Sequence, residues 1–232
     1  MAETIGERLQ RVREEIEEAR RHSLTGEEVQ LIAVTKTHPV SLIREALAAG
    51  VTDIGENKVQ ELTGKIEEIG PQVRYHMIGN LQSNKVKYIY ENVALIHSLD
   101  RRSLGKEIEK RAAQTDTTVS CLLQVNIGRE PQKGGVDPDD AIKLVESLQD
   151  FQHIHLKGLM CVAPNTEDEG ELRNCFRNMV KIREQIQGMH YDRVDMDILS
   201  MGMSHDFPIA IQEGSNMVRI GSHIFGARNY NK

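Results

Sequence analysis

Short apolar runs alternate with longer amphipathic stretches along almost the whole chain. The short runs have the length of buried strands, and the longer stretches carry apolar residues at helical spacing. Eight runs are predicted as strands: 30–36, 52–55, 74–79, 94–98, 119–127, 156–162, 195–200 and 217–220. The stretches between them are predicted as helices over 41–49, 57–69, 83–90, 101–113, 138–148, 168–186 and 205–213.

Strands that alternate with helices are typical of parallel sheets joined by right-handed crossovers. Eight such units in 232 residues predict an α/β fold of the (β/α)8 TIM barrel class, as one domain over residues 1–232. A first helix over about 3–22 is expected to pack on the barrel where it closes. The alternative is an open doubly wound sheet, but no GxGxxG motif follows an early strand.

Charge and composition exclude several classes of partner. The net charge is −6, so neither a nucleic acid nor an anionic membrane is an expected partner. Trp is absent and aromatic residues make up 4%, which leaves few surfaces for stacking on single-stranded nucleic acid. No stretch is long enough to cross a bilayer, and the charged N-terminus does not have the pattern of a signal peptide.

The cysteine and histidine patterns predict no metal site and no disulfide. Cys121, Cys161 and Cys175 form no CxxC pair and are odd in number, which favours reduced thiols in a cytoplasmic protein. His153 and His155 have the spacing of a ligand pair, but no third ligand stands at a useful distance along the chain.

Lys36 ends the first predicted strand, and Pro39 marks where that strand must stop. Burial at a strand end disfavours the ammonium cation and favours the neutral, nucleophilic amine. A Schiff base with an aldehyde needs such an amine. The alternative is a lysine whose head group reaches solvent, and Lys36 by itself favours that interpretation.

The loops after strands seven and eight predict a phosphate site. Ser200-Met201-Gly202-Met203-Ser204 follows strand seven, and Gly221-Ser222 follows strand eight. TIM barrel enzymes often bind phosphate with these two loops. Glycine lets backbone N–H groups approach an oxyanion, and serine adds a hydroxyl donor. Each loop alone is more typical of an ordinary turn, but the two together at the expected positions favour phosphate.

Three further residues are candidates for the same end of the barrel. Arg219 stands two residues before Gly221, and an inward guanidinium would meet a ring nitrogen or a carboxylate. A structural salt bridge is an equal alternative for Arg219. Asn57 and His76 would line the mouth, although Asn57 would also suit a helix cap and His76 a satisfied core position.

A lysine amine, a phosphate cradle and an arginine around one barrel mouth suggest pyridoxal 5′-phosphate (PLP). This cofactor carries an aldehyde, a phosphate and a ring nitrogen. A Schiff-base aldolase that acts on a sugar phosphate would use the first two features. A third hypothesis is an interaction module in which Lys36 is structural.

Several motifs occur in the order typical of one known family. They are residues 33–37 (AVTKT), 55–57 (GEN), 76–85 (HMIGNLQSNK), 199–204 (LSMGMS), 218–222 (VRIGS) and 224–226 (IFG). On these motifs the chain resembles the YggS/PROSC family of pyridoxal phosphate homeostasis proteins, from about Leu31 to Tyr230. Together the motifs are far more specific than any one of them.

The resemblance implies a single barrel like the N-terminal domain of bacterial alanine racemase, with PLP held as a Schiff base on Lys36. It places the phosphate on Ser200, Ser204, Gly221 and Ser222, and the ring nitrogen near Arg219. The cofactor-binding residues that it implies are Lys36, Asn57, His76, Ser200, Met201, Ser204, Arg219, Gly221 and Ser222. The family often has Ser at position 35, Lys at 38, Trp at 75 and Thr at 216 and 222. Threonine at 222 would keep the hydroxyl.

The resemblance also implies a role in PLP homeostasis, in which the protein buffers PLP or delivers it to PLP-dependent apoenzymes and influences amino-acid and keto-acid balance. Racemisation needs acid/base groups on both faces of the ring, which the second domain of alanine racemase completes. Few residues follow strand eight here, and a cation such as Arg219 disfavours protonation of the ring nitrogen. We therefore expect a non-catalytic, monomeric, cytoplasmic protein. The alternative is a PLP-dependent amino-acid racemase-like enzyme.

Overall fold

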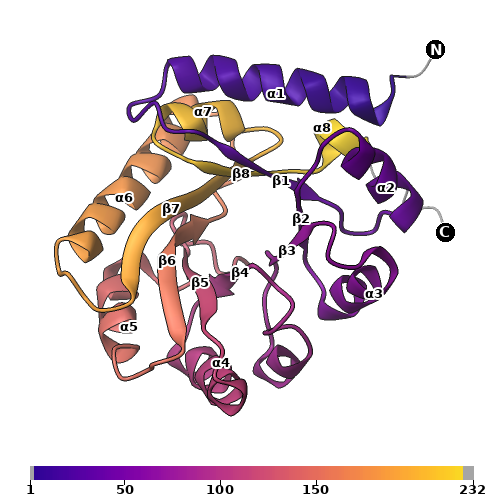
Figure 1. The fold of residues 1–232 in the computed structure, drawn as a ribbon. Coiled ribbons are helices and arrows are strands. Elements are labelled where there is room, and N and C mark those ends of the chain that lie inside the picture. The colour runs from indigo at the N-terminus through magenta and orange to yellow at the C-terminus, as the bar shows by residue number, and fades with distance from the viewer. Residues whose placement is uncertain (1–2, 227–232) are drawn as a thin grey trace.

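Eight parallel strands form a closed barrel in the computed structural model, which describes residues 3–226 (Figure 1). Each strand pairs with the next along the chain, and β8 pairs with β1 to close the barrel. The strands are β1 (Gln30–Val34), β2 (Asp53–Glu56), β3 (Arg74–Met77), β4 (Leu95–Leu99), β5 (Val119–Val125), β6 (Ile154–Cys161), β7 (Val194–Met203) and β8 (Met217–Ile220). The predicted TIM barrel is confirmed. Tyr230, the expected end of the family resemblance, lies outside the described residues.

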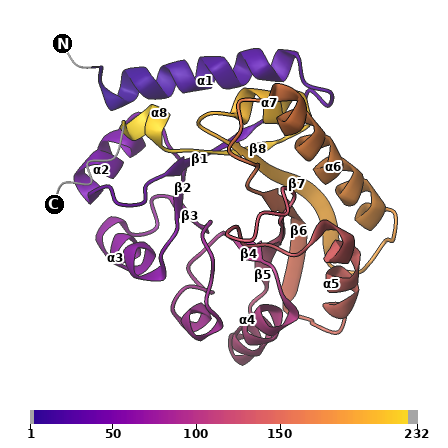
Figure 2. The ribbon, with the colours of Figure 1, turned by 180° about the vertical axis from the view of Figure 1, so that it is seen from behind.

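Helices surround the barrel and connect its strands (Figure 2). They are α1 (Ile5–Arg21), α2 (Val40–Ala48), α3 (Val59–Ile69), α4 (Arg102–Thr115), α5 (Ala141–Ser147), α6 (Glu169–Gln187), α7 (Phe207–Gln212) and α8 (Ser222–Phe225), with 3₁₀ helices η1 (Ser83–Tyr88) and η2 (Pro138–Asp140). Among residues 3–226, none of these helices combines the length and the apolar composition that crossing a membrane requires.

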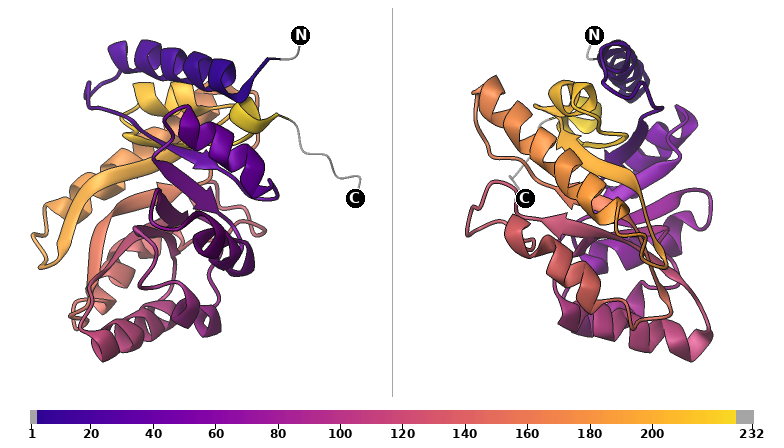
Figure 3. Two further views of the ribbon diagram at one scale, coloured as in Figure 1. Left: turned by 45° about the vertical axis from the view of Figure 1, so that its right-hand side comes forward. Right: turned by 90° about the vertical axis from the view of Figure 1, so that its left-hand side faces the viewer.

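The first helix lies across the closing pair of strands. Thr4 caps α1 and forms a capping box with Glu7, which satisfies two backbone donors of the first turn. The apolar stripe of α1 includes Leu9 and Val12, both fully buried. Each such side chain contributes about 1.5–3 kcal/mol of transfer free energy. This stripe packs on α7, α8 and α2, the helices that flank β8 and β1 (Figure 3).

The core has two separate layers, one outside the strands and one inside the barrel. Successive side chains of a strand point to opposite faces, so alternate residues belong to different layers. The inner apolar cluster is small and consists of Ile32, Leu95, Leu122, Met160 and Met217. Their chain neighbours pack against the helices in the outer cluster. Two residues further along β4 and β8 than this inner cluster, the same inward positions hold His97 and Arg219. The carboxyl half of the barrel interior is therefore polar.

Strand β7 runs to Met203, three residues beyond the predicted end at 200. The sequence indicated a loop there because of Gly202, but this glycine lies within the strand at φ +96°. A Cβ at Gly202 would stand 2.8 Å from the Cβ of Ala210 and 2.9 Å from the Cα of Phe207. The pairing of β7 with β8 shifts register between Ser200 and Met203, so the glycine marks a strand irregularity.

Other boundaries differ at helix ends. The segment predicted as a helix over 83–90 is a 3₁₀ helix, and 138–148 divides into η2 and α5. Helix α3 begins at Val59, with Lys58 in extended conformation at its N-cap. Asn57 is therefore not the helix cap. The four residues of α8 directly after Gly221 were not predicted as a helix.

Candidate functional site

A pocket of about 450 Å³ opens at the carboxyl ends of the strands. Its size falls within the range of about 300–1,000 Å³ that is usual for small-molecule sites. Eleven residues line it: Val34, Lys36, Asn57, Ile78, Val162, Met203, Ser204, His205, Arg219, Gly221 and Ser222. Six of the nine predicted site residues are among them, brought together from β1, β2, β7 and β8. His76, Ser200 and Met201 are not.

Lys36 follows β1 and is held by an unusual turn. The next residue, Thr37, has φ +66°, a left-handed conformation that costs a residue with a Cβ about 1 kcal/mol. The hydroxyl of Thr37 donates to the carbonyl oxygen of Lys36 at 2.6 Å, and its N–H donates to Oε2 of Glu61 at 2.8 Å. These contacts fix the backbone from which the lysine side chain extends to the pocket.

A buried ion pair supports the end of β1 from outside the barrel. Nζ of Lys65 donates to the carbonyl oxygen of Thr35 at 2.8 Å and to Oε1 of Glu56. The hydroxyl of Thr35 donates to the same carboxylate oxygen at 2.5 Å. Burial raises the pKa of Glu56, although Lys65 and Thr35 oppose the shift. The ion pair ties β1, β2 and α3 together directly beside Lys36, so we assign Lys65 a structural role.

Asn57 lies against the segment that follows β3. A Cβ at Gly79 would lie 2.4 Å from the carbonyl oxygen of Asn57, which leaves no room for any other residue there. The glycine at position 79 therefore has a steric reason. It positions the backbone after β2 at the mouth of the barrel.

The two loops predicted to bind phosphate meet at one side of this pocket. Ser204 follows β7, and Gly221 and Ser222 follow β8. Across residues 3–226, the hydroxyls of Ser204 and Ser222 take part in no hydrogen bond, although Ser204 is buried. The N–H of Met203 donates to Oδ1 of Asp206 at 2.6 Å, which orders the β7 loop. Two unused hydroxyl donors thus face the same space, as a phosphate site requires.

Arg219 forms the floor of the pocket and is 4% exposed. Its Nη1 donates to the carbonyl oxygen of Ser200 at 2.7 Å and to the Ser200 hydroxyl at 2.5 Å. Its Nη2 donates to the carbonyl oxygen of Cys161 at 2.7 Å. Burial lowers the pKa of Arg219 from its ordinary value, which Cys161 and Asp206 partly offset. Its recorded partners among residues 3–226 are neutral oxygens, so no salt bridge explains its position.

Sequence comparison identifies the family. The profile described as alanine racemase, N-terminal domain, matches residues 8–229. A protein from Aquifex aeolicus named pyridoxal phosphate homeostasis protein is 42% identical over 226 residues, which are 97% of this chain and 98% of that protein. A protein of the same name from Haemophilus influenzae is 40% identical and covers 87% of this chain and 86% of its own length. The chain belongs to the pyridoxal phosphate homeostasis protein family. The resemblance recognised in the motifs is confirmed.

Solved structures agree with this family assignment. PipY of Synechococcus elongatus, solved with PLP bound, is 34% identical, with a TM-score of 0.85, and the match covers 96% of this chain and all (100%) of PipY. An alanine racemase from Clostridium difficile has a TM-score of 0.72 at 13% identity and covers 96% of this chain and 58% of its own. The racemase therefore shares the fold alone.

The three predicted residues outside the pocket wall lie behind it. Ser200 and Met201 are fully buried in β7, and the Ser200 hydroxyl contacts Arg219 instead of the pocket. His76 is 2% exposed in β3. Its Nε2 contacts Oδ1 of Asp53 at 2.8 Å, and its Nδ1 contacts Nε2 of His97 at 3.0 Å. His76 is a satisfied interior residue, the alternative that the sequence left open.

Sequence reasoning missed five pocket residues: Val34, Ile78, Val162, Met203 and His205. A signal for three of them was present. Val34 stands two residues before Lys36 and Ile78 two after His76, so strand alternation places each on the same inward face as a predicted residue. Met203 lies between two predicted residues in the β7 motif.

Residues 3–226 contain no cluster of three or more His, Cys, Asp or Glu side chains suited to a metal ion.

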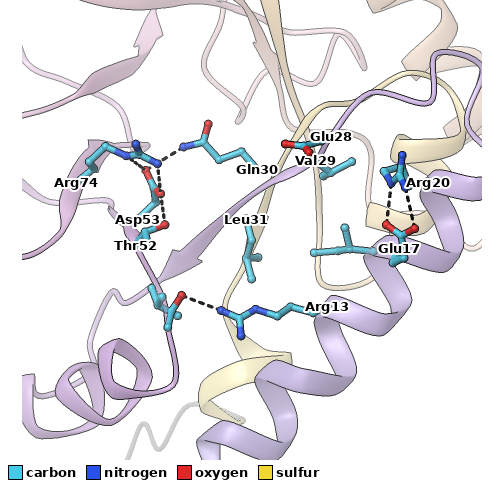
Figure 4. A pocket seen from close by; sticks show the side chains of 13 residues that line it. Arg13, Glu17, Arg20, Glu28, Val29, Gln30, Leu31, Thr52, Asp53 and Arg74 are labelled. Atoms are coloured by element: carbon cyan, nitrogen blue, oxygen red, sulfur yellow. Dashed lines mark hydrogen bonds and ion pairs between the residues drawn. The ribbon is translucent and has the colours of Figure 1, made fainter.

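A second pocket, of about 460 Å³, lies at the amino ends of the strands (Figure 4). Most of its polar side chains are paired within the chain. Arg74 donates to both carboxylate oxygens of Asp53 at 2.7 Å, and Arg20 donates to Glu17 at 2.7 and 2.8 Å. Arg13 donates to backbone carbonyl oxygens of the α2–β2 connection. This pocket therefore offers few unsatisfied groups to a ligand.

Proposed function

We propose that this chain binds PLP in the carboxyl-end pocket. Lys36 would hold the aldehyde carbon as a Schiff base, and Ser204, Gly221 and Ser222 would hold the phosphate. The ring nitrogen would face Arg219, and Asn57 would lie near the ring. The observation that carries the proposal is the juxtaposition of Lys36, Arg219 and two unused serine hydroxyls around one pocket of about 450 Å³.

The residues present fit the chemical groups of PLP. The two hydroxyls supply hydrogen bonds to an anion, and Gly221 lets the backbone approach it. Hydrogen bonds to Ser200 and Cys161 use three of the five N–H donors of Arg219, which leaves two for a ring nitrogen. The structure of PipY with PLP bound supports the proposal, because PipY is 34% identical over 96% of this chain.

We propose further that the protein buffers PLP or delivers it to PLP-dependent apoenzymes, without a catalytic turnover of its own. When bound, PLP supplies an electron sink that depends on protonation of its ring nitrogen. A guanidinium cation facing that nitrogen disfavours the protonated form. The relatives are named homeostasis proteins, which supports this role. A monomeric, cytoplasmic protein is part of the same proposal, and the buried free thiols of Cys121 and Cys161 agree with a reducing compartment.

The test is the visible absorbance of purified protein incubated with PLP, before and after borohydride. Wild type should show a visible absorbance band that reduction abolishes, and mass spectrometry should place the reduced adduct on the Lys36 peptide. Lys36→Ala should lose both signals. Lys143→Ala, which removes an exposed lysine of α5, is the matched control and should keep them.

Two results would contradict the proposal. An adduct that persists in Lys36→Ala would move the linkage to another lysine, and a wild type that takes up no PLP would remove the cofactor. Assays with each enantiomer of alanine and of serine test the absence of turnover. Racemisation by wild type that is lost in Lys36→Ala would make the protein an enzyme.

A further inference from the structure

Five polar side chains on five strands form one continuous line through the barrel interior. Oδ1 of Asp53 contacts Nε2 of His76 at 2.8 Å, and Nδ1 of His76 contacts Nε2 of His97 at 3.0 Å. Nδ1 of His97 contacts the hydroxyl of Ser200 at 3.1 Å, which contacts Nη1 of Arg219 at 2.5 Å. All five residues are at least 96% buried. The line starts beside the amino-end pocket and ends at the floor of the carboxyl-end pocket.

Hydrogen-bond accounting gives this line one direction. Arg219 has only donors, so the Ser200 oxygen must accept from it. The Ser200 hydrogen then goes to Nδ1 of His97, the second recorded partner of that hydroxyl. Because Nδ1 of a neutral His97 accepts this hydrogen, the ring proton of His97 is on Nε2, which donates to Nδ1 of His76. His76 in turn donates from Nε2 to the Asp53 carboxylate.

The protonation states of His97 and Asp53 agree with this direction. Burial lowers the pKa of His97 well below its ordinary value, and His76 and Arg219 lower it further, so the imidazole is neutral. Although burial raises the pKa of Asp53, hydrogen bonds from His76, Arg74 and Thr52 outweigh that effect and keep it a carboxylate. A doubly protonated His97 would donate to Ser200 and leave the serine hydrogen without an acceptor.

The line uses part of the donor capacity of Arg219 and leaves the rest for the pocket. A guanidinium has five N–H donors. Both hydrogens of Nη1 go to Ser200, and one hydrogen of Nη2 goes to Cys161. One hydrogen of Nη2 and the Nε hydrogen remain. The guanidinium is therefore fixed on the side away from the pocket by Ser200, and the orientation of Ser200 is fixed by His97.

We propose that His97 is a positioning residue for the bound cofactor. By accepting the Ser200 hydrogen, His97 turns the serine lone pairs to Arg219 and holds the guanidinium against the pyridine nitrogen of PLP. His76 and Asp53 fix the tautomer in which His97 can do this. The inference rests on the proposed PLP site and names residues that act on PLP without touching it.

A purely structural role of His97 predicts a different pattern of binding. If the line only stabilises the barrel, its loss weakens binding of every ligand in the pocket by the same factor. If it acts through Arg219 on the ring nitrogen, its loss weakens only ligands that have this nitrogen. The 1-deaza analogue of PLP has a C–H group in its place and keeps the aldehyde and the phosphate, so it separates the two roles.

The experiment compares the Kd of PLP and of 1-deaza-PLP for wild type, His97→Gln and His97→Asn, by visible titration of protein freed of PLP by dialysis. The glutamine amide stands where Nε2 was and offers no acceptor to Ser200, whereas the asparagine oxygen stands where Nδ1 was. We expect His97→Gln to raise the Kd of PLP about tenfold, which is the usual cost of a lost hydrogen bond to a charged group. His97→Asn should raise it much less, and neither variant should change the Kd of 1-deaza-PLP. His155→Gln, a histidine of β6 paired with Asp195, is the control.

Equal losses for both ligands in His97→Gln would overturn the proposal, and so would an unchanged Kd for PLP. Ser200→Ala removes the hydroxyl that links His97 to Arg219 and should give the same ligand-dependent loss, which keeps the test decisive if His97→Gln fails to fold. Failure of the PLP site itself is distinguishable, because it would appear as the absence of a borohydride-trapped adduct in wild type.

Discussion

The carboxyl and amino ends of the barrel hold pockets of similar volume, about 450 and 460 Å³. They differ in how far their polar side chains are hydrogen-bonded within the chain. At the amino end, the guanidinium groups of Arg13, Arg20 and Arg74 are paired with carbonyl or carboxylate oxygens. At the carboxyl end, the hydroxyls of Ser204 and Ser222 bond to no atom of residues 3–226. Both hydroxyls line the carboxyl-end pocket, where they are available to a ligand. Volume alone would not have separated the two pockets.

The largest expected effect is on stability and comes from the amino end. Asp53→Ala removes the carboxylate that accepts hydrogen bonds from His76, Gln30 and Arg74. The N–H groups of these three residues then lose this acceptor. The free energy of unfolding should fall by about 3 kcal/mol, measured by urea denaturation. Asp53→Asn keeps one oxygen acceptor and should lose less. An unchanged free energy of unfolding in Asp53→Ala would show that the hydrogen bonds of Asp53 at the amino end do not stabilise the barrel.

At the carboxyl end, substitutions should affect PLP binding instead of stability. Ser204→Ala and Ser222→Ala each remove one proposed donor to the phosphate and should each raise the Kd of PLP about tenfold. Ser222→Thr keeps the hydroxyl and should bind PLP nearly as wild type does. Pyridoxal, which lacks the phosphate, tests the assignment. Equal losses for pyridoxal and PLP would contradict a phosphate site at these residues.

The barrel interior between the two ends should make stability depend on pH. The folded-state pKa of His97 is lowered, so the unfolded chain binds the proton more tightly. This contribution is complete above the unfolded pKa of about 6.5 and is lost as pH falls from there toward the folded pKa. The free energy of unfolding should fall by at most about 1.4 kcal/mol per pH unit in that window. Urea denaturation at several pH values should show a flatter profile for His97→Asn, and an unchanged profile would contradict a neutral His97.

Much of the fold was predictable because its signals are local. The strand over 217–220 has the predicted bounds, since an apolar run ending in glycine gives both its start and its end. The end of β7 was not predictable, because Gly202 is inside the strand for a tertiary reason. Its missing Cβ makes room for Phe207 and Ala210, which no local pattern reveals.

The candidate site divides in the same way. The sequence predicted pocket residues at the strand ends, such as Lys36 and Ser222, because barrel topology brings those ends together. It could not tell that Ser200 faces Arg219 and Ser204 faces the pocket, since both stand in one short motif. Side-chain hydrogen bonds across the barrel interior, between β4, β7 and β8, decide this. They make His97, which no motif highlighted, a neighbour of Ser200.

The smallest expected effect concerns Arg20, which lines the amino-end pocket. Its partners are Glu17, at 2.7 Å, and the carbonyl oxygen of Gly26, at 2.9 Å. Exposed ion pairs of this kind are screened by water and salt, so Arg20→Ala should leave the thermal midpoint nearly unchanged. The Kd of PLP should be unaffected, since Arg20 lies at the opposite end of the barrel. Inorganic phosphate sharpens the comparison. If phosphate raises the thermal midpoint of wild type but not of Arg20→Ala, the amino end also binds anions. Arg20 would then exchange its bonds to Glu17 and Gly26 for bonds to the ligand.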